Sequence, residues 1–283
     1  MTPVPPVPLP PGRTVLVPDR GEFFVRDSAG DGPPVLLLHG WTFSADTNWF
    51  AVYGPLQEAG FRVIALDHRG HGRGLRSTDE FRLTDCAADA AAVLRELGAG
   101  PAVAVGYSMG GPIAQLLARD HPETVDALVL CATAQDWQDW YLKGYWRSMA
   151  LVRLWLGLFP TRVWHWLLGM ARMPRGVRRD WIAAELSRGS SVDLAEAGRE
   201  LSRYDARPWI DRLRHLRSAV VLTTRDRSVL PRKQRKLAKA LGAPVFEVRG
   251  DHFAVATEAD AFVRALLEAL EAVAAPRAVA QAA

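Results

Sequence analysis

The stretch that decides the fold runs from Pro101 to Gly111 and reads PAVAVGYSMGG. Its first half is a short apolar run that predicts a buried β-strand, and helical periodicity follows it. Ser108 stands between the two, in the pattern Gly106-Tyr107-Ser108-Met109-Gly110. Glycine on both sides permits a sharp strand-to-helix turn, which would project the serine hydroxyl beyond the edge of a sheet. The stretch therefore predicts a nucleophile at the carboxyl end of a strand.

Strand and helix patterns alternate on both sides of this stretch. A hairpin is expected from Arg13 to Arg26, and helices are expected at Asp85–Leu97 and near Ala259–Val273. Five further apolar runs are expected as strands: Val35–Leu38, Arg62–Leu66, Val125–Leu130, Ala219–Thr223 and Pro244–Val248. Apolar strands that alternate with helices are typical of a parallel sheet covered on both faces. We therefore predict an α/β protein with a mostly parallel eight-stranded sheet flanked by helices.

One long segment breaks the alternation. Residues 133–207 contain no convincing strand, and the α/β pattern resumes after them, so we expect an all-helical cap inserted into the core. The predicted divisions are a Pro-rich arm at 1–12, a core made of 13–132 and 208–274, the cap, and a flexible tail at 275–283.

The charge and the tryptophans concentrate in this cap. The chain has 283 residues, 31 arginines, four lysines and a net charge of +4, and seven of its ten tryptophans lie between Trp137 and Trp181. That window carries a net charge of +6, and the rest of the chain carries −2. Because the basicity is local and no nucleic-acid motif accompanies it, we expect no nucleic-acid partner.

The composition also bears on cofactors and on location. Cys86 and Cys131 are too few for a disulfide scaffold or a four-ligand zinc site, and both are expected to be buried. No metal-ligand spacing is present, so neither a metal nor an organic cofactor is expected. Because the sequence shows no signal peptide and no long apolar span, we expect a cytoplasmic protein.

A serine hydroxyl needs a base and an acid to orient that base. Among seven histidines, His252 follows the last predicted strand in Gly250-Asp251-His252-Phe253, and Asp226 follows the strand before it. Both would then lie at the carboxyl edge of the sheet, where open α/β sheets place their sites. We predict a catalytic triad of Ser108, His252 and Asp226, with Asp251 and Asp205 as weaker alternatives for the acid.

Acyl transfer also needs donors for a developing oxyanion. The backbone N–H of Met109, at the start of a helix, is one candidate, and the N–H of Trp41, in the loop after the first parallel strand, is the second. We expect Trp41 and Tyr107 to contact the substrate. The alternative for Trp41 is a core aromatic residue.

Five motifs together resemble the α/β-hydrolase fold superfamily. They are His39-Gly40-Trp41, the loop from Asp67 to Gly72, Gly106 to Gly111, Asp226 before Pro231, and Gly250-Asp251-His252. The resemblance implies Ser108 as nucleophile, His252 as base, Asp226 as orienting acid, and Trp41 and Met109 as oxyanion donors. It also implies structural roles for His39, His68 and His71.

The serine narrows the chemistry within that superfamily. Epoxide hydrolases and haloalkane dehalogenases resemble this frame but use Asp at the same position, so Ser108 argues against both. We predict a serine hydrolase that cleaves a hydrophobic carboxylic ester, esterase- or lipase-like. Acyl transfer, perhydrolysis, C–C bond hydrolysis, and a ligand-binding module with incidental turnover remain alternatives.

Three alternatives remain for the apolar surface of the cap. Its aromatic side chains pack onto the core and roof the substrate site, or they contact an anionic membrane or lipid aggregate, or they mediate a dimer. The sequence leaves the oligomeric state open.

Overall fold

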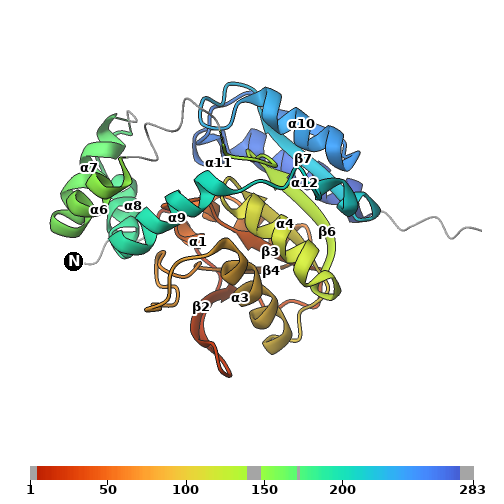
Figure 1. Ribbon diagram of the computed structural model, residues 1–283, viewed down its shortest axis with the longest axis horizontal. Helices are drawn as coiled ribbons and strands as arrows, with labels where there is room; N and C mark the ends of the chain where they lie inside the picture. Colours follow the sequence, from red (N-terminus) through yellow and green to blue (C-terminus); the bar gives the residue numbers. More distant parts are fainter. Residues whose placement is uncertain (1–4, 139–147, 171–172, 275–283) are drawn as a thin grey trace, which may run out of the picture.

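The computed structural model describes residues 5–138, 148–170 and 173–274, which form a sheet, its flanking helices and a helical cap at one end (Figure 1). The strands are β1 (Gly12–Val17), β2 (Gly21–Asp27), β3 (Pro34–Leu38), β4 (Arg62–Leu66), β5 (Ala102–Tyr107), β6 (Val125–Cys131), β7 (Arg217–Thr223) and β8 (Val245–Val248). The core helices are α1 (Ala45–Trp49), α2 (Tyr53–Glu58), α3 (Leu83–Glu96), α4 (Gly110–Asp120), α10 (Pro231–Leu241), α11 (Ala254–Thr257) and α12 (Ala259–Ala274), with short 3₁₀ helices η1 (Pro122–Thr124) and η3 (Ile210–His215).

The strands form one eight-stranded sheet in the order β1-β2-β4-β3-β5-β6-β7-β8. From β4 to β8 each neighbouring pair is parallel, and β2 pairs antiparallel with both β1 and β4. The prediction of a mostly parallel eight-stranded sheet flanked by helices is therefore confirmed. Because the strands β3 to β8 run the same way, the loops that follow them gather at one edge of the sheet.

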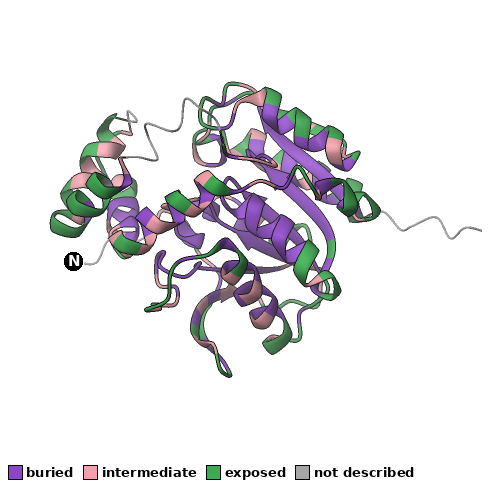
Figure 2. Ribbon diagram, viewed as in Figure 1, coloured by how far each residue is buried: buried purple, intermediate pink, exposed green. Residues whose placement is uncertain are grey.

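Both faces of the sheet are buried (Figure 2). Leu36 and Leu38 of β3 belong to the apolar cluster that includes α3, α4 and α10, whereas Val35 and Leu37 belong to the cluster that includes α1, α2 and α12. This division follows from the strand period of two, which sends successive side chains to opposite faces. It explains why the strands read as continuous apolar runs in the sequence.

Within the described residues between β6 and β7, four helices make up the cap. They are α6 (Met149–Leu158), α7 (Pro160–Met170), α8 (Val177–Leu186) and α9 (Ser191–Arg203). Helix α6 packs against α7 and α9, and α7 packs against α8. A separate apolar cluster joins Trp164, Trp181 and Leu194 of the cap to Phe50 of the core, with the Phe50 and Trp181 rings edge to face at 5.9 Å.

Polar contacts attach α8 and α9 to the core. Arg73 Nη2 lies 3.3 Å from Glu185 Oε2, Arg76 Nη2 donates to the Arg188 carbonyl at 2.6 Å, and the Phe81 N–H donates to Glu196 at 3.0 Å. Helices α8 and α9 of the cap are thus attached to the core by both apolar and polar contacts. The predicted tail at 275–283 and cap residues 139–147 lie outside the described residues.

No helix in the described part of the chain combines the length and the apolar character needed to cross a bilayer.

Candidate active site

Ser108 lies at a tight turn between β5 and α4. Its backbone φ is +51°, a left-handed conformation that is strained for a residue with a side chain. A Cβ on Gly106 would lie 2.3 Å from the Gly110 carbonyl oxygen, and a Cβ on Gly110 would lie 2.0 Å from the Leu38 carbonyl oxygen. Both positions therefore require glycine, because a side chain at Gly106 would clash with the backbone at the start of α4 and one at Gly110 would clash with the backbone at the end of β3.

The three side chains of the predicted triad form a continuous hydrogen-bonded chain. His252 Nε2 lies 2.9 Å from Ser108 Oγ, and His252 Nδ1 lies 2.7 Å from Asp226 Oδ2. Ser108 and His252 are 144 positions apart in the sequence, and the parallel sheet brings them together at one edge. In this arrangement the imidazole can accept the serine proton while the carboxylate holds its other nitrogen.

The Asp226 carboxylate is buried and held from several sides. Oδ1 accepts hydrogen bonds from the backbone N–H groups of Ser228 and Val229, both at 2.8 Å. Oδ2 accepts from Thr223 Oγ1 at 2.9 Å and from Gln234 Nε2 at 3.3 Å. With these donors in place the carboxylate has one orientation, which fixes the histidine ring in turn.

The two alternative acids lie elsewhere. Asp251 is exposed and accepts a hydrogen bond from the Phe253 N–H at 2.8 Å, and Asp205 forms an ion pair with Arg207 at 2.6 Å. Neither is the residue on His252 Nδ1, so the structure places Asp226 in that position.

The two predicted oxyanion donors come from segments that adjoin the nucleophile. Met109 directly precedes α4, and the first N–H groups of a helix lack acceptors within that helix. A Cβ on Gly40 would lie 3.3 Å from Ser108 Cβ, so the Gly40–Trp41 loop passes against the serine. Thr42 in the same loop has a φ of +69°, a second strained position beside the site.

Tyr107 requires a correction. Tyr107 was expected to contact the substrate, but it is fully buried and is not among the residues that line the cavity. Its hydroxyl donates to the His252 carbonyl at 2.8 Å, and its ring packs against Trp49 and Phe262. Burial raises the pKa of the phenol well above its usual value, so it remains a donor. Tyr107 supports the loop that carries the histidine.

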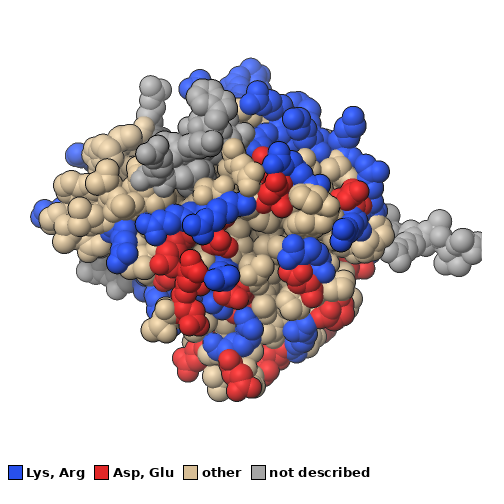
Figure 3. Space-filling view, in the orientation of Figure 1, with Lys and Arg blue, Asp and Glu red and all other residues tan. Residues whose placement is uncertain are grey.

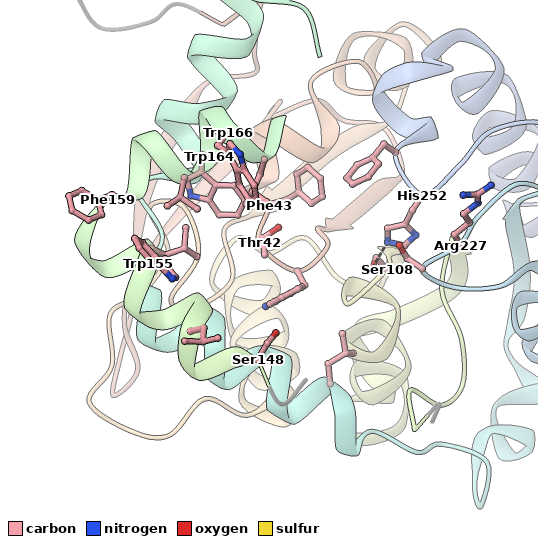
Figure 4. A pocket seen from close by; sticks show the side chains of 18 of the residues that line it. Thr42, Phe43, Ser108, Ser148, Trp155, Phe159, Trp164, Trp166, Arg227 and His252 are labelled. Carbon is pink, nitrogen blue, oxygen red and sulfur yellow. Dashed lines mark hydrogen bonds between the residues drawn. The ribbon is translucent and has the colours of Figure 1, made fainter. Parts of the chain in front are cut away.

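A cavity of about 1110 Å³ opens above the triad (Figure 4). Ser108, His252 and Arg227 lie on one side of it, and aromatic side chains of α6 and α7 lie on the other. Trp41 lines the cavity as predicted, and its indole Nε1 donates to the Leu194 carbonyl of α9 at 2.7 Å. The oxyanion loop and the cap are therefore directly connected.

Several lining residues were not singled out from the sequence. On the core side they are Thr42, Phe43, Arg227, Ser228 and Phe253. Phe253 and Arg227 each adjoin a triad residue, which is the only signal that the sequence offers for them. The rings of Phe43 and Phe253 are 6.3 Å apart and come from loops that only the fold brings together.

His39, His68 and His71 form a buried cluster beside the site. His39 Nε2 accepts a hydrogen bond from the His68 N–H at 2.9 Å, and the His39 and His68 ring centroids are 4.1 Å apart. Burial lowers the pKa of His39 to about 4 and that of His71 to about 3, so both are neutral near pH 7.

Cys86 and Cys131 are free and buried, as predicted, and burial raises the pKa of both thiols. Across residues 5–138, 148–170 and 173–274, no group of three or more His, Cys, Asp or Glu side chains is arranged to hold a metal ion.

The chain is similar in sequence to a known protein family and to several curated proteins. The profile of a family described as "alpha/beta hydrolase fold" matches residues 33–259. A non-heme haloperoxidase of Rhodococcus erythropolis is 40% identical over 117 residues, which are 41% of this chain and 42% of the relative. A bifunctional esterase/perhydrolase of Acinetobacter calcoaceticus is 38% identical over 118 residues, 41% of this chain and 42% of that one. The chain thus aligns with about two fifths of the length of these curated relatives.

Solved structures extend the likeness to the whole fold. An esterase from Exiguobacterium antarcticum superposes with a TM-score of 0.80 at 19% identity, covering 92% of this chain and 100% of that one. At this identity the superposition shows a shared fold.

Proposed function

Because the chain belongs to the alpha/beta hydrolase fold family, we propose that it is a serine hydrolase that cleaves a hydrophobic carboxylic ester through an acyl-enzyme. The observation that carries the proposal is the chain of contacts from Ser108 Oγ through His252 to Asp226, at 2.9 and 2.7 Å, beneath an apolar cavity. The proposed reaction needs these side chains, backbone N–H groups for the oxyanion, and water.

The proposed reaction has two halves. Ser108 Oγ attacks the ester carbonyl while His252 Nε2 takes its proton, and the N–H groups of Met109 and Trp41 stabilise the oxyanion. His252 then protonates the departing alcohol, which leaves the acyl group on Ser108. In the second half, a water molecule gives a proton to His252 Nε2 and its oxygen attacks the acyl carbonyl. The bond from that carbon to Ser108 Oγ then breaks, His252 returns the proton to Oγ, and the carboxylic acid leaves. Asp226 stays ionised throughout and holds the imidazole.

The cavity supports a hydrophobic substrate. Its cap side presents Leu151, Trp155, Leu156 and Trp164, which offer contact area and few hydrogen-bonding groups. Arg227 and Ser228 supply polar groups next to His252, at the end where the ester carbonyl would lie. A ligand with an extended apolar part and an ester at one end fits this distribution.

A fluorophosphonate probe tests the nucleophile. We expect the wild-type protein to be labelled and Ser108→Ala to lose both labelling and ester hydrolysis, with a fall in kcat on the order of 10⁵-fold or more. The matched control is Ser77→Ala, which removes a half-buried hydroxyl that does not line the cavity and should label as the wild type does. Labelling that persists in Ser108→Ala, or a burst of product without turnover, would contradict the proposal and favour a binding module.

A series of p-nitrophenyl esters of increasing acyl length tests the substrate class. Since each buried methylene contributes about 0.8 kcal/mol, kcat/KM should rise with acyl length until the cavity is filled. A preference for acetate over longer chains would argue against the hydrophobic substrate while leaving the nucleophile intact.

Perhydrolysis is a second candidate, favoured by the names of two relatives, a haloperoxidase and an esterase/perhydrolase. The acyl-enzyme would be the same, and hydrogen peroxide would replace water as the acceptor. Measuring peracid against carboxylic acid at increasing peroxide separates the two. Hydrolysis predicts that acid remains the main product when peroxide is far below the concentration of water.

A further inference from the structure

Helix α6 turns an apolar row toward solvent. Leu151, Leu154, Trp155 and Leu158 follow the spacing that normally marks the buried face of a helix. Each is nevertheless between 52 and 60% exposed. The opposite side packs inward, since Leu156 is buried and a Cβ on Gly157 would lie 3.2 Å from Ser191 Oγ of α9.

The exposed apolar row continues through Phe159, just after α6, and onto α7. Phe159 is 43% exposed, Trp166 63% and Met170 61%. Together with the four residues of α6 they form what we call the outer cap face. Scattered apolar side chains are usual on a protein surface, but a contiguous group of this size marks a surface that contacts something else.

The two helices that carry the outer cap face have only positive formal charges, and Asp180 of α8, which is exposed, lies 3.9 Å from His165 of α7. The sequence from Ser148 to Met170 contains two arginines and no aspartate or glutamate. Arg162 is exposed and lies over the Phe159 ring at 6.0 Å. In Figure 3 the surface where Figure 1 places α6 and α7 is largely tan with a few blue side chains, and the red side chains lie closer to the core.

The same face also borders the cavity. Leu151, Trp155, Phe159 and Trp166 are all strongly exposed, and all four line the space above Ser108. A molecule leaving an apolar phase at this face would reach the cavity mainly over apolar side chains.

We propose that the outer cap face docks on an anionic lipid surface, from which hydrophobic substrate enters the cavity. Tryptophan, leucine and arginine on helices that carry no acidic residue of their own are the composition expected of an interfacial segment. A protein partner seated on this face would cover residues that border the cavity. In a two-fold dimer through this face, Arg162 of each copy would be brought toward a like charge. Docking itself does not depend on the proposed ester hydrolysis.

Co-sedimentation of the full chain with lipid vesicles tests the proposal. We expect binding to vesicles of phosphatidylglycerol mixed with phosphatidylcholine, weaker binding to phosphatidylcholine alone, and loss of binding as salt is raised. Leu154→Ser, Leu158→Ser and Met170→Ser combined remove apolar surface that does not line the cavity, and should raise the apparent Kd about tenfold or more. Arg162→Gln should raise it about fivefold on anionic vesicles and little on neutral ones.

Matched controls separate this surface from general effects. Leu16→Ser replaces an equally exposed leucine on β1, and Arg212→Gln removes an exposed positive charge on η3. Both should bind vesicles as the wild type does. Ser108→Ala should also bind normally, so a failed hydrolase assay and a failed docking assay are distinguishable. Absence of anionic-vesicle binding, or binding unchanged by both cap variants, would overturn the proposal. Concentration-dependent dimerisation abolished by the triple variant would instead assign the face to a second copy.

Discussion

Ser108, His252 and Asp226 on the core side of the cavity are joined by hydrogen bonds, with Ser108 and Asp226 buried and His252 half-buried, whereas Trp155 and Trp166 on the cap side are more than half exposed. The core side is held by strand ends, by glycines that admit no side chain, and by four donors to one carboxylate besides the histidine. The cap side is held through α8 and α9, and α6 and α7 attach mainly to those helices.

The two sides differ because one performs nucleophilic attack and the other contacts the apolar part of a substrate. Nucleophilic attack depends on distances and angles, so the groups that perform it need directional bonds that fix them. Contact with an apolar chain depends mainly on area and is not directional, so the wall that makes it can be loosely held. The core side of the cavity is therefore fixed by directional hydrogen bonds, whereas the cap side is formed by apolar contacts that need no fixed geometry.

The largest effect on the catalytic rate is expected from a change on the core side of the cavity. Asp226→Asn would place a donor against His252 Nδ1 and favour the tautomer whose Nε2 cannot accept the serine proton. We expect kcat to fall about 10⁴-fold, measured with a soluble activated ester. Asp251→Asn is the matched control, since it changes the exposed carboxylate next to His252 and should keep the wild-type rate. Equal losses in the two variants would contradict the assignment of the acid.

A pair of tryptophans compares the two halves of the cap. Trp181 is 2% exposed and packs on Phe50, and Trp155 is 54% exposed. Trp181→Ala should lower the free energy of unfolding by about 3 kcal/mol or more, and Trp155→Ala should lower it by less than about 1 kcal/mol. Urea denaturation measures both. A similar loss in both variants would show that α6 is anchored as firmly as α8.

Acid should weaken the core through its buried histidines. Burial lowers the pKa of His39 to about 4 and that of His71 to about 3 in the folded protein, below the ordinary histidine value of about 6.5. As the pH falls below 6.5 the unfolded chain binds protons that the folded chain does not, so the free energy of unfolding decreases. From pH 7 to pH 5 each histidine should cost about 2 kcal/mol.

Urea titrations at pH 7 and pH 5 measure this loss. His71→Gln should shrink the difference between the two free energies of unfolding by the share of one histidine. An unchanged difference in His71→Gln would count against the buried neutral histidine.

The smallest effect is expected for Tyr107→Phe. It removes the hydroxyl that donates to the His252 carbonyl and leaves that acceptor unpaired, which should cost about 1 kcal/mol. We expect kcat to fall severalfold with KM nearly unchanged, because the residue positions the histidine and does not line the cavity. A change confined to KM would instead support contact with the substrate.

The sequence predicted the core well because its signals are local. Strand β4 was expected at Arg62–Leu66 and forms there, and the other strands were located to within about two residues. The turn around Ser108 was predictable because its geometry depends on neighbouring glycines. Tyr107 was misjudged because adjacent residues of a strand face opposite ways, and this one points into the cluster beneath α12.

For the cap, the sequence predicted helices but not which surface covers each of their faces. Its helices were expected, but the sequence of Ser148–Phe159 is apolar on nearly all sides except at Arg153, which indicated only that something must cover this surface. Periodicity does not say which partner covers that surface. The fold shows that α9 covers the side with Leu156 and Gly157, and that the row with Trp155 remains exposed.

By itself, then, the sequence determined the alternating sheet, the turn that exposes a serine, and the order in which serine, acid and histidine occur, since each follows from residues close together in the chain. Only the tertiary structure decided that His252 lies 2.9 Å from Ser108, that Tyr107 supports it from behind, and that the outer cap face borders the cavity while facing solvent. Those relations join segments distant in sequence, and their geometry depends on packing that no local pattern encodes.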